Sequence, residues 1–405
     1  MRIGILTYHQ SVNNGAVMQA YALSRRLKEL YPACEVEIVD YRMNTVEKTY
    51  AYTLEQYLSS SSFRVKIRRC LDLIRDPQYL RRYRRRTEVF ASCLDQLPLS
   101  PLCIRSDDLD EVSAYINERY DILVVGSDAI WNYLSRGFKN AYLPGDEIRT
   151  AKLSYAASCY GMDFFKAPDS EREIIRSSLN GFRFIGVRDN ATEEFVRWSG
   201  SLTEPVHTCD PTVFLEVNKL PVNEDLLRQK LKRAGFDFKR PTIGIMGTDR
   251  MVKMVRRLFG RKYQIAALYE PVKGADVNPY DLTPYEWAYV FRYFKLTITT
   301  FFHGTLVSLR NGVPVVCIAL NSEFAKVHMP KTLDILTRLG FADWYFETDY
   351  ETKNIEAIKQ RVEDFLAGDY KEQVLAALDR EAESFEAFNM ALKQLINVSR
   401  YKDND

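Results

Sequence analysis

The sequence predicts an α/β protein in which short buried strands alternate with amphipathic helices. Short apolar segments rich in β-branched residues recur along the chain, as is typical of parallel strands covered on both faces. Between them, apolar residues recur at helical spacing, and basic residues occupy the opposite face of the first such helix. With 405 residues, the chain is long enough for two domains of this class.

The first half opens with a predicted strand over residues 2–8, followed by a loop over 9–14 and a long helix. A second strand is expected over 35–41. Further strands are predicted over 121–125, 152–156, 182–187 and 206–209. This opening is Rossmann-like, but it lacks the Gly-x-Gly-x-x-Gly pattern, which disfavours a dinucleotide site.

The composition changes after Asp210-Pro211-Thr212, and this change divides the chain. Residues 1–215 are predicted to form the first domain, and the polar segment 216–240 the linker and the edge of the second domain. A second series over 241–350 contains expected strands at 242–246, 264–268, 296–300 and 313–319 and an expected helix at 284–294. Residues 351–405 are predicted to be helical and to pack back on the first domain.

A basic, helix-like insertion interrupts the first domain at about residues 44–115. Apolar residues alternate with arginine over 64–86, and Arg81 to Arg86 contain five arginines around Tyr83. Three interpretations remain open: a solvated face, an anionic membrane surface, or a nucleic-acid patch. Membrane attraction would contribute roughly 1 kcal/mol per basic residue near the surface. The nucleic-acid interpretation lacks a recognisable binding motif.

The amino-acid composition limits which cellular compartment and which binding partners are expected. The net charge of +2 gives no overall field that favours nucleic acid, so no nucleic-acid partner is expected. Seven scattered cysteines without Cys-x-x-Cys fit a reducing compartment and disfavour a zinc site. Residues 1–8 resemble a strand more than a signal peptide, and no apolar run approaches the ~18 residues of a membrane span. A cytoplasmic protein is expected, at the inner membrane face if the insertion binds lipid.

The strand–helix–strand unit over residues 296–319 contains the first candidate functional residue. His303-Gly304 opens a short helix directly after a predicted strand, and Gly312 ends it. Open α/β sheets bind ligands at the carboxyl ends of their strands. A histidine beside the free N–H groups of a helix start can bind an anion and move a proton. His303 is therefore predicted to be catalytic.

This unit and four further segments resemble the polysaccharide pyruvyl transferase family. The segments are Asn13-Asn14-Gly15-Ala16, Gly126-Ser127-Asp128-Ala129-Ile130-Trp131, Val187-Arg188-Asp189, Asp210-Pro211-Thr212 and His303-Gly304-Thr305 with Gly312-Val313-Pro314. They occur in order over residues 1 to about 340. The resemblance implies two Rossmann-like domains facing across a cleft, the GT-B architecture. It also implies pyruvyl transfer from phosphoenolpyruvate to a sugar of a cell-surface polysaccharide or its lipid-linked precursor, without metal or other cofactor.

On this resemblance the donor site contains His303 and Arg188, whose planar guanidinium can hold a carboxylate or phosphate. Gly304 and Thr305 accompany His303, and Arg310 and Lys326 are secondary cations. One position departs from the family: many members have an arginine two residues before the histidine, where this chain has Phe301.

Acceptor or anion-binding residues are expected at two other strand ends. Asn14 and Gly15 begin the first long helix, where they could bind an anion or form a plain cap. Ser127, Asp128 and Trp131 follow the strand at 121–125. Asp128 is a candidate general base for a sugar hydroxyl or a helix cap, and Trp131 either stacks on a sugar or packs beneath the turn.

Two alternative functions stay open. A GT-B glycosyltransferase would bind a nucleotide sugar, and Gly247-Thr248-Asp249-Arg250 could contact its nucleotide. A non-catalytic, sugar-binding relative is conceivable because of Phe301.

Overall fold

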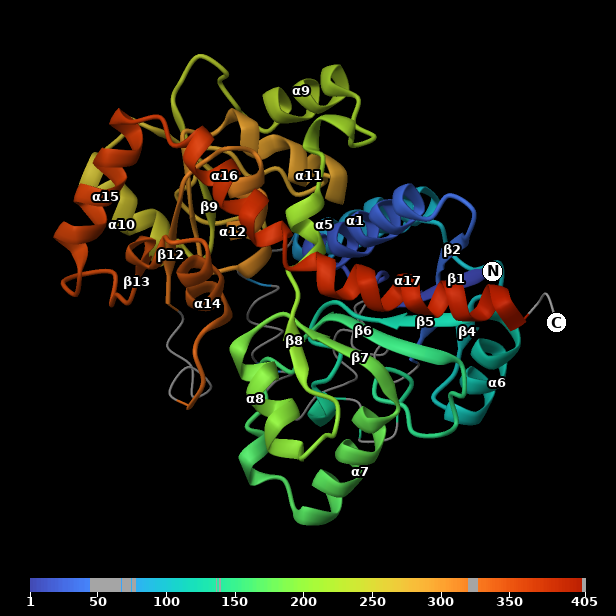
Figure 1. Cartoon of the computed structure of the whole chain (residues 1–405). Helices are drawn as coiled ribbons and strands as arrows, with labels where there is room; N and C mark the ends of the chain where they lie inside the picture. Colours follow the sequence, from blue (N-terminus) through green and yellow to red (C-terminus); the bar gives the residue numbers. More distant parts are fainter. Residues whose placement is uncertain are drawn as a thin grey trace.

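The computed structural model describes residues 1–43, 67, 74, 78–135, 137, 140–319 and 327–402. The chain forms two α/β domains, each built on a parallel sheet (Figure 1). Lys326 and most of the segment 44–77 lie outside the described residues.

The first sheet has six parallel strands in the order β2-β1-β5-β6-β7-β8. Their bounds are Arg2–Leu6 (β1), Glu35–Ile38 (β2), Ile122–Val125 (β5), Ala151–Ala157 (β6), Phe182–Val187 (β7) and Pro205–His207 (β8). All four residues of the Ile-Leu-Val-Val strand β5 are buried, because helices cover both faces of the sheet. These helices include α1 (Asn14–Leu30), α6 (Leu109–Arg119), α7 (Asp169–Asn180) and α8 (Asn190–Ser199). A separate two-stranded sheet pairs β3 (Tyr41–Arg42) with β4 (Ile104–Arg105).

The second sheet has five parallel strands in the order β10-β9-β11-β12-β13. Their bounds are Thr242–Met246 (β9), Gln264–Ala267 (β10), Leu296–Thr299 (β11), Val315–Ile318 (β12) and Tyr345–Phe346 (β13). Its described helices include α10 (Asp249–Phe259), α11 (Pro284–Val290), α12 (Phe302–Arg310), α14 (Lys331–Arg338), α15 (Ile355–Ala367) and α16 (Lys371–Ala382). The prediction of two Rossmann-like domains is confirmed.

Residues 216–240, expected as a linker, are largely ordered against the second domain. They contain a 3-10 turn at Val217–Lys219 and the helix α9 at Glu224–Arg233. Leu227 and Leu231 of α9 are fully buried, and Lys230 Nζ lies 2.7 Å from Glu286 Oε2 on α11. The high charge of the segment reflects the solvated face of an amphipathic helix rather than a flexible connection.

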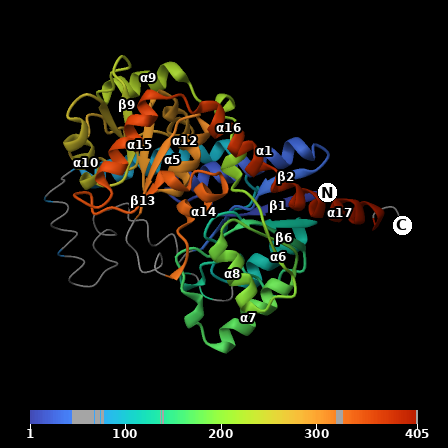
Figure 2. The same ribbon diagram turned by 60° about the vertical axis from the view of Figure 1, so that its left-hand side comes forward.

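The last helix, α17 (Phe385–Lys402), returns from the second domain to the first and runs along the first sheet (Figures 1 and 2). The Phe388 ring lies 4.7 Å from the Tyr155 ring of β6. Tyr31 Oη at the end of α1 donates to Asn389 Oδ1 over 2.6 Å. This packing buries one face of the C-terminal helix against the domain in which the chain begins.

The two domains also contact each other directly. The Tyr21 ring of α1 meets the Tyr285 ring of α11 edge to face at 5.2 Å. The amide of Asn190 at the start of α8 donates to Asp334 Oδ2 on α14 over 3.0 Å. These contacts bring the loops that follow β1, β7, β8 and β11 together between the sheets.

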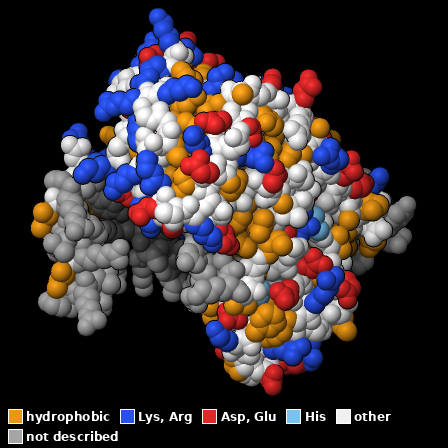
Figure 3. Space-filling view, turned by 90° about the vertical axis from the view of Figure 1, so that its left-hand side faces the viewer, with side chains coloured by type: hydrophobic (Ala, Val, Ile, Leu, Met, Phe, Trp, Pro, Cys, Tyr) orange, Lys and Arg blue, Asp and Glu red, His pale blue; other side chains and the backbone are white. Residues whose placement is uncertain are grey.

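The basic insertion is described only in part. Arg81 to Arg86 lie on α5 (Tyr79–Cys93). The Arg86 side chain is only partly exposed to solvent, because it also contacts the second domain. Its Nη1 donates to the Tyr269 carbonyl over 2.9 Å, so this arginine joins α5 to the second domain. On the face shown in Figure 3, Lys and Arg side chains are interspersed with Asp and Glu. Within the described ranges, no helix is both long and apolar enough to cross a bilayer.

Candidate functional site

The carboxylate of Asp210 joins the two residues that the sequence singles out for an anion site. Arg188 Nη1 donates to Asp210 Oδ2 over 2.8 Å. His303 Nε2 lies 3.6 Å from the same oxygen. Arg188 belongs to the first domain and His303 to the second, so the two side chains converge between the domains.

The local sequence explains why these side chains project from the same region. Arg188 directly follows β7, and its neighbour Asp189 caps α8 by accepting from the Thr192 amide over 3.0 Å. Asp210 follows β8 and accepts from the Thr212 amide over 2.9 Å, which caps a 3-10 turn at Pro211–Phe214. His303 lies in the first turn of α12, after β11. Each residue therefore occupies the carboxyl end of a parallel strand, where open α/β sheets place ligands.

Arg188 is buried among acidic groups. Its side chain is 2% exposed, and besides Asp210 it has Asp128 Oδ1 at 4.0 Å and Asp189 Oδ2 at 3.9 Å. Burial alone would lower the pKa of Arg188, but the three carboxylates raise it, so the guanidinium stays charged. The Phe302 ring covers one face of this guanidinium at 4.7 Å.

Asp210 also remains ionised. Burial alone would raise the pKa of Asp210, but the nearby imidazole of His303, followed by the charge of Arg188, holds it well below its ordinary value. Arg188 Nε, Arg188 Nη2 and His303 Nε2 are nevertheless buried without a hydrogen-bond partner among the described residues. The cluster thus keeps polar groups available for a further acceptor.

Lys331 is a second cation of this cluster, and the sequence analysis did not identify it. Its Nζ lies 4.8 Å from the Tyr160 ring and 5.6 Å from the Phe302 ring, which also contacts Arg188. Burial, followed by the charge of Arg188, lowers the pKa of Lys331. The only local signal was its position after Pro330 at a helix start.

Gly15 places the start of α1 directly against His303. A Cβ built on Gly15 would lie 2.0 Å from His303 Nδ1, so only glycine permits this approach. Asn13 caps the helix by accepting from the Gly15 amide over 2.9 Å. Asn14 itself is buried in the first turn and is not the cap.

The side chains of the other predicted donor residues that the structure describes do not reach the cluster. A Cβ on Gly304 would meet Met246 Sδ at 2.7 Å and Thr299 Oγ1 at 2.8 Å, so this glycine allows α12 to pack on the sheet. Thr305 is fully buried and donates to the Phe301 carbonyl over 3.1 Å. Arg310 lies at the far end of α12, where Nε donates to the Leu215 carbonyl over 2.8 Å. Lys326 lies outside the described residues.

Among the predicted acceptor residues, only Asp128 lies near both Arg188 and a cavity. Ser127 is buried and hydrogen-bonded to Gln19. Trp131 is fully buried, and its Nε1 donates to the Tyr142 carbonyl over 2.9 Å, so it packs beneath the turn and cannot stack on a sugar. Both residues shape the loop that presents Asp128.

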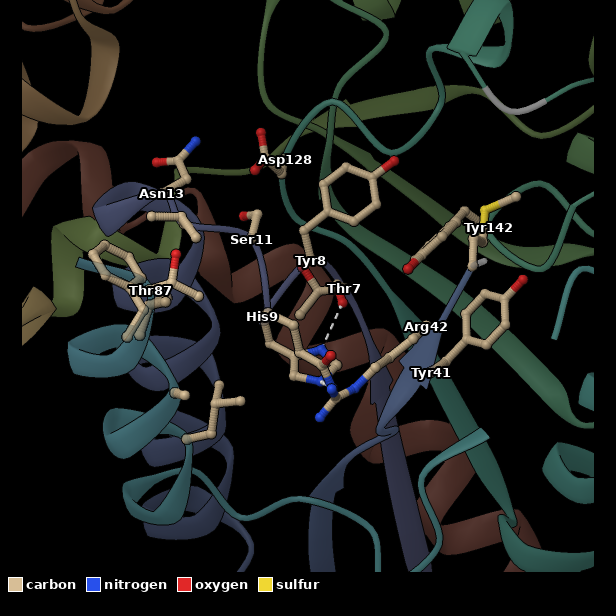
Figure 4. A pocket seen from close by; sticks show the side chains of 17 residues that line it. Thr7, Tyr8, His9, Ser11, Asn13, Tyr41, Arg42, Thr87, Asp128 and Tyr142 are labelled. Carbon is tan, nitrogen blue, oxygen red and sulfur yellow. Dashed lines mark hydrogen bonds between the residues drawn. The ribbon is translucent and has the colours of Figure 1, made fainter. Parts of the chain in front are cut away.

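A cavity of about 380 Å³ opens beside the cluster, at the carboxyl end of β1 (Figure 4). Its lining includes Asp128, Asn13 and three tyrosines, Tyr8, Tyr41 and Tyr142. Within the described part of the chain, no three His, Cys, Asp or Glu side chains are arranged to hold a metal ion.

The Gly247-Thr248-Asp249-Arg250 segment is occupied by contacts within the second domain. Arg250 Nη2 donates to the Asp349 carbonyl over 2.6 Å, and Asp249 Oδ2 lies 3.1 Å from Lys253 Nζ.

The architecture of two Rossmann-like domains with a polar cluster between them defines a GT-B protein. Solved structures agree. A candidate UDP-N-acetylglucosamine 2-epimerase from Listeria monocytogenes is 12% identical, with a TM-score of 0.50 over 100% of this chain and 97% of that one. The UDP-N-acetylglucosamine 2-epimerase from Neisseria meningitidis, bound to UDP-N-acetylglucosamine, is 11% identical, with a TM-score of 0.50 over 96% of this chain and 100% of that one. At this identity the likeness concerns the fold alone.

The sequence itself gives the family. The family model of polysaccharide pyruvyl transferase matches residues 13–322. The chain belongs to the polysaccharide pyruvyl transferase family, as the ordered motifs predicted, and the matched range includes Gly15, Arg188, Asp210 and His303. No curated protein matches the chain significantly.

Proposed function

We propose that the protein transfers a pyruvyl group from phosphoenolpyruvate to a sugar of a cell-surface polysaccharide or its lipid-linked precursor and forms a pyruvate ketal. The observation that supports this proposal is the convergence of Arg188 and His303, from different domains, on Asp210. Family membership supplies the reaction class.

The donor is a small polyanion with a carboxylate and a phosphate. Arg188 offers Nε and Nη2, which lack hydrogen-bond partners among the described residues. Two such donors in a planar guanidinium suit one carboxylate or phosphate group. Lys331 supplies the second positive charge, in a chain that has Phe301 where many relatives have arginine.

The proposed chemistry balances over two hydroxyl groups of the same sugar. One hydroxyl proton ends on the methylene carbon of the donor, which becomes a methyl group, and both hydroxyl oxygens bond to C2. The other proton leaves with the phosphate. His303, held beside the Asp210 carboxylate, delivers the proton to carbon, and Asp128 accepts a proton from the attacking hydroxyl.

A thermal-shift comparison tests the donor. We expect phosphoenolpyruvate to raise the melting temperature, by the equivalent of about 2.7 kcal/mol at a hundredfold excess over Kd, and UDP-N-acetylglucosamine to leave it unchanged. A shift with the nucleotide sugar alone would favour a glycosyltransferase. Carbohydrate affinity without turnover, and no shift with either compound, would indicate a non-catalytic relative.

The rate of pyruvyl transfer tests the catalytic role of His303. We expect His303→Ala to lower kcat about 10²–10⁴-fold, the usual contribution of a general acid or base. His207→Ala is the matched control, because His207 also has a carboxylate partner, Glu381 Oε1 at 2.7 Å, but lies outside the cluster. Pyruvyl transfer at the wild-type rate in folded His303→Ala would remove His303 from the mechanism.

A further inference from the structure

The cavity at the carboxyl end of β1 is distinct in character from the Arg188 cluster. We infer that it binds the pyranose ring of the acceptor sugar, with the reacting hydroxyls toward Asp128. This inference rests on the proposed function, which requires a sugar beside the donor.

The walls of the cavity suit a sugar ring. The Tyr8 and Tyr142 rings meet edge to face at 5.1 Å, and the Tyr41 ring lies 5.8 Å from that of Tyr142. Figure 4 shows these three tyrosines apart from Thr87, which lies on α5 on the other side of the view. Tyrosine combines an apolar ring, which can cover C–H groups, with a hydroxyl that can bond to a sugar oxygen. The cavity volume of about 380 Å³ lies within the range of small-ligand sites.

Beneath the cavity, the Asp40 carboxylate has both His9 and Arg42 as partners. His9 is buried, with Nδ1 3.1 Å from the Thr7 carbonyl and Nε2 3.1 Å from Asp40 Oδ1. Arg42 Nε lies 3.4 Å from the same Asp40 oxygen. Burial alone would raise the pKa of Asp40, but His9 and then Arg42 hold it below its ordinary value. Among the described residues, the charge of Arg42 beneath the cavity is paired with Asp40, which favours a neutral ligand over an anion there.

Two links connect the cavity to the anion cluster. Asp128 lines the cavity and has Oδ1 4.0 Å from Arg188 Nη2. Asn13 lines it as well, and two residues later Gly15 packs against His303. A sugar in the cavity therefore has Asp128 at the end nearest the donor. A neutral ligand and an anionic donor are thereby assigned to adjoining sites.

Filling the cavity from α5 tests the inference. Thr87 lines it, and its Oγ1 donates to the Tyr83 carbonyl over 3.0 Å. Thr87→Trp should occupy the space. The matched control is Thr337→Trp on α14, because Thr337 is exposed and makes the same bond, to the Leu333 carbonyl over 2.8 Å. Ala91→Trp, from an exposed position of α5 that also lines the cavity, is the second filling variant.

The readout is saturation-transfer NMR with the methyl pyranosides of galactose, glucose, mannose and N-acetylglucosamine, without donor. We expect the wild type and Thr337→Trp to saturate the ring protons of at least one glycoside. Thr87→Trp and Ala91→Trp should weaken that binding at least tenfold and keep the phosphoenolpyruvate thermal shift. Undiminished sugar binding in the folded filling variants, or no saturation of any glycoside by the wild type, would overturn the inference.

The two proposals fail separately. Sugar saturation that the filling variants abolish, without a phosphoenolpyruvate shift, would retain the cavity assignment and reject the donor. A thermal shift with phosphoenolpyruvate, without saturation of any sugar, would retain the donor and reject the assignment of the cavity to the acceptor sugar.

Discussion

The imidazole of His303 packs directly on the Cα of Gly15, so closely that a Cβ there would lie 2.0 Å from Nδ1. The contact joins the first turn of α1 to the first turn of α12, across the two domains. Glycine at position 15 is therefore a condition for the placement of the proposed catalytic histidine.

Gly15→Ala should displace His303 while both domains keep their cores. We expect a fall in kcat of about 10²-fold, because a displacement near 1 Å can cost that much in a catalytic site. Steady-state kinetics with the melting temperature as a folding check measures it. The control is Gly145→Ala, whose new Cβ would meet only the end of the Glu147 side chain, at 2.6 Å. Wild-type kcat in Gly15→Ala would show that the His303 position does not matter.

Asp210→Asn should weaken both activity and stability. It leaves the Arg188 guanidinium buried beside a neutral amide, and breaking a buried ion pair costs roughly 3–5 kcal/mol. Because the pKa of Asp210 is depressed in the folded state, its stabilisation is present above the unfolded pKa of about 3.9 and is lost as the pH falls through the folded value.

Urea unfolding of the wild type and Asp210→Asn at several pH values measures this difference. We expect it to be constant near neutrality and to narrow below about pH 4. A difference that does not change with pH would contradict an ionised Asp210 as its source.

Lys331→Met should stabilise the fold and at the same time weaken donor binding. The pKa of Lys331 is lowered mainly by burial, so folding disfavours its charge, and removing it should raise the melting temperature. This gain should fade as the pH approaches about 10.4, where the unfolded lysine also loses its proton.

The same substitution should abolish the thermal shift with phosphoenolpyruvate, because one cation of the donor site is lost. Lys253→Met is the control, since Lys253 is 71% exposed and lies on α10. Unchanged donor binding in Lys331→Met would place Lys331 outside the donor site.

The exposed arginines of α5 test membrane association, which remains a proposal. Arg84 and Arg85 are 74% and 54% exposed, and each lies near Glu88. If α5 meets anionic lipid, Arg84→Gln with Arg85→Gln should weaken vesicle binding by about 2 kcal/mol, roughly 30-fold. Cosedimentation with phosphatidylserine vesicles at low salt measures it, and Lys232→Gln with Arg233→Gln, at the exposed end of α9, is the control. Absence of wild-type binding would reject the proposal.

The local sequence pattern located two residues of the candidate site, Arg188 and His303. Hydrophobic periodicity placed Arg188 and His303 at the ends of strands, and the structure has β7 end at Val187 and β11 at Thr299. Gly304 and Thr305, predicted beside His303, face the sheet instead, because successive helical residues turn by about 100°. The two-residue strand β13 is too short to give a periodic signal.

The sequence by itself determined the α/β class, the positions of most strands along the chain, the family and the histidine that opens α12. The resemblance to the family had already placed Arg188 and that histidine in one site. Tertiary structure alone decided that Gly15, Asp210 and Lys331 join them, and that Trp131 and Thr305 do not. The reason is physical: periodicity reports which face of an element is buried, whereas contacts between residues from different domains depend on how the two sheets pack together. That packing is set by contacts such as Tyr21 with Tyr285 and the return of α17, which join distant parts of the chain.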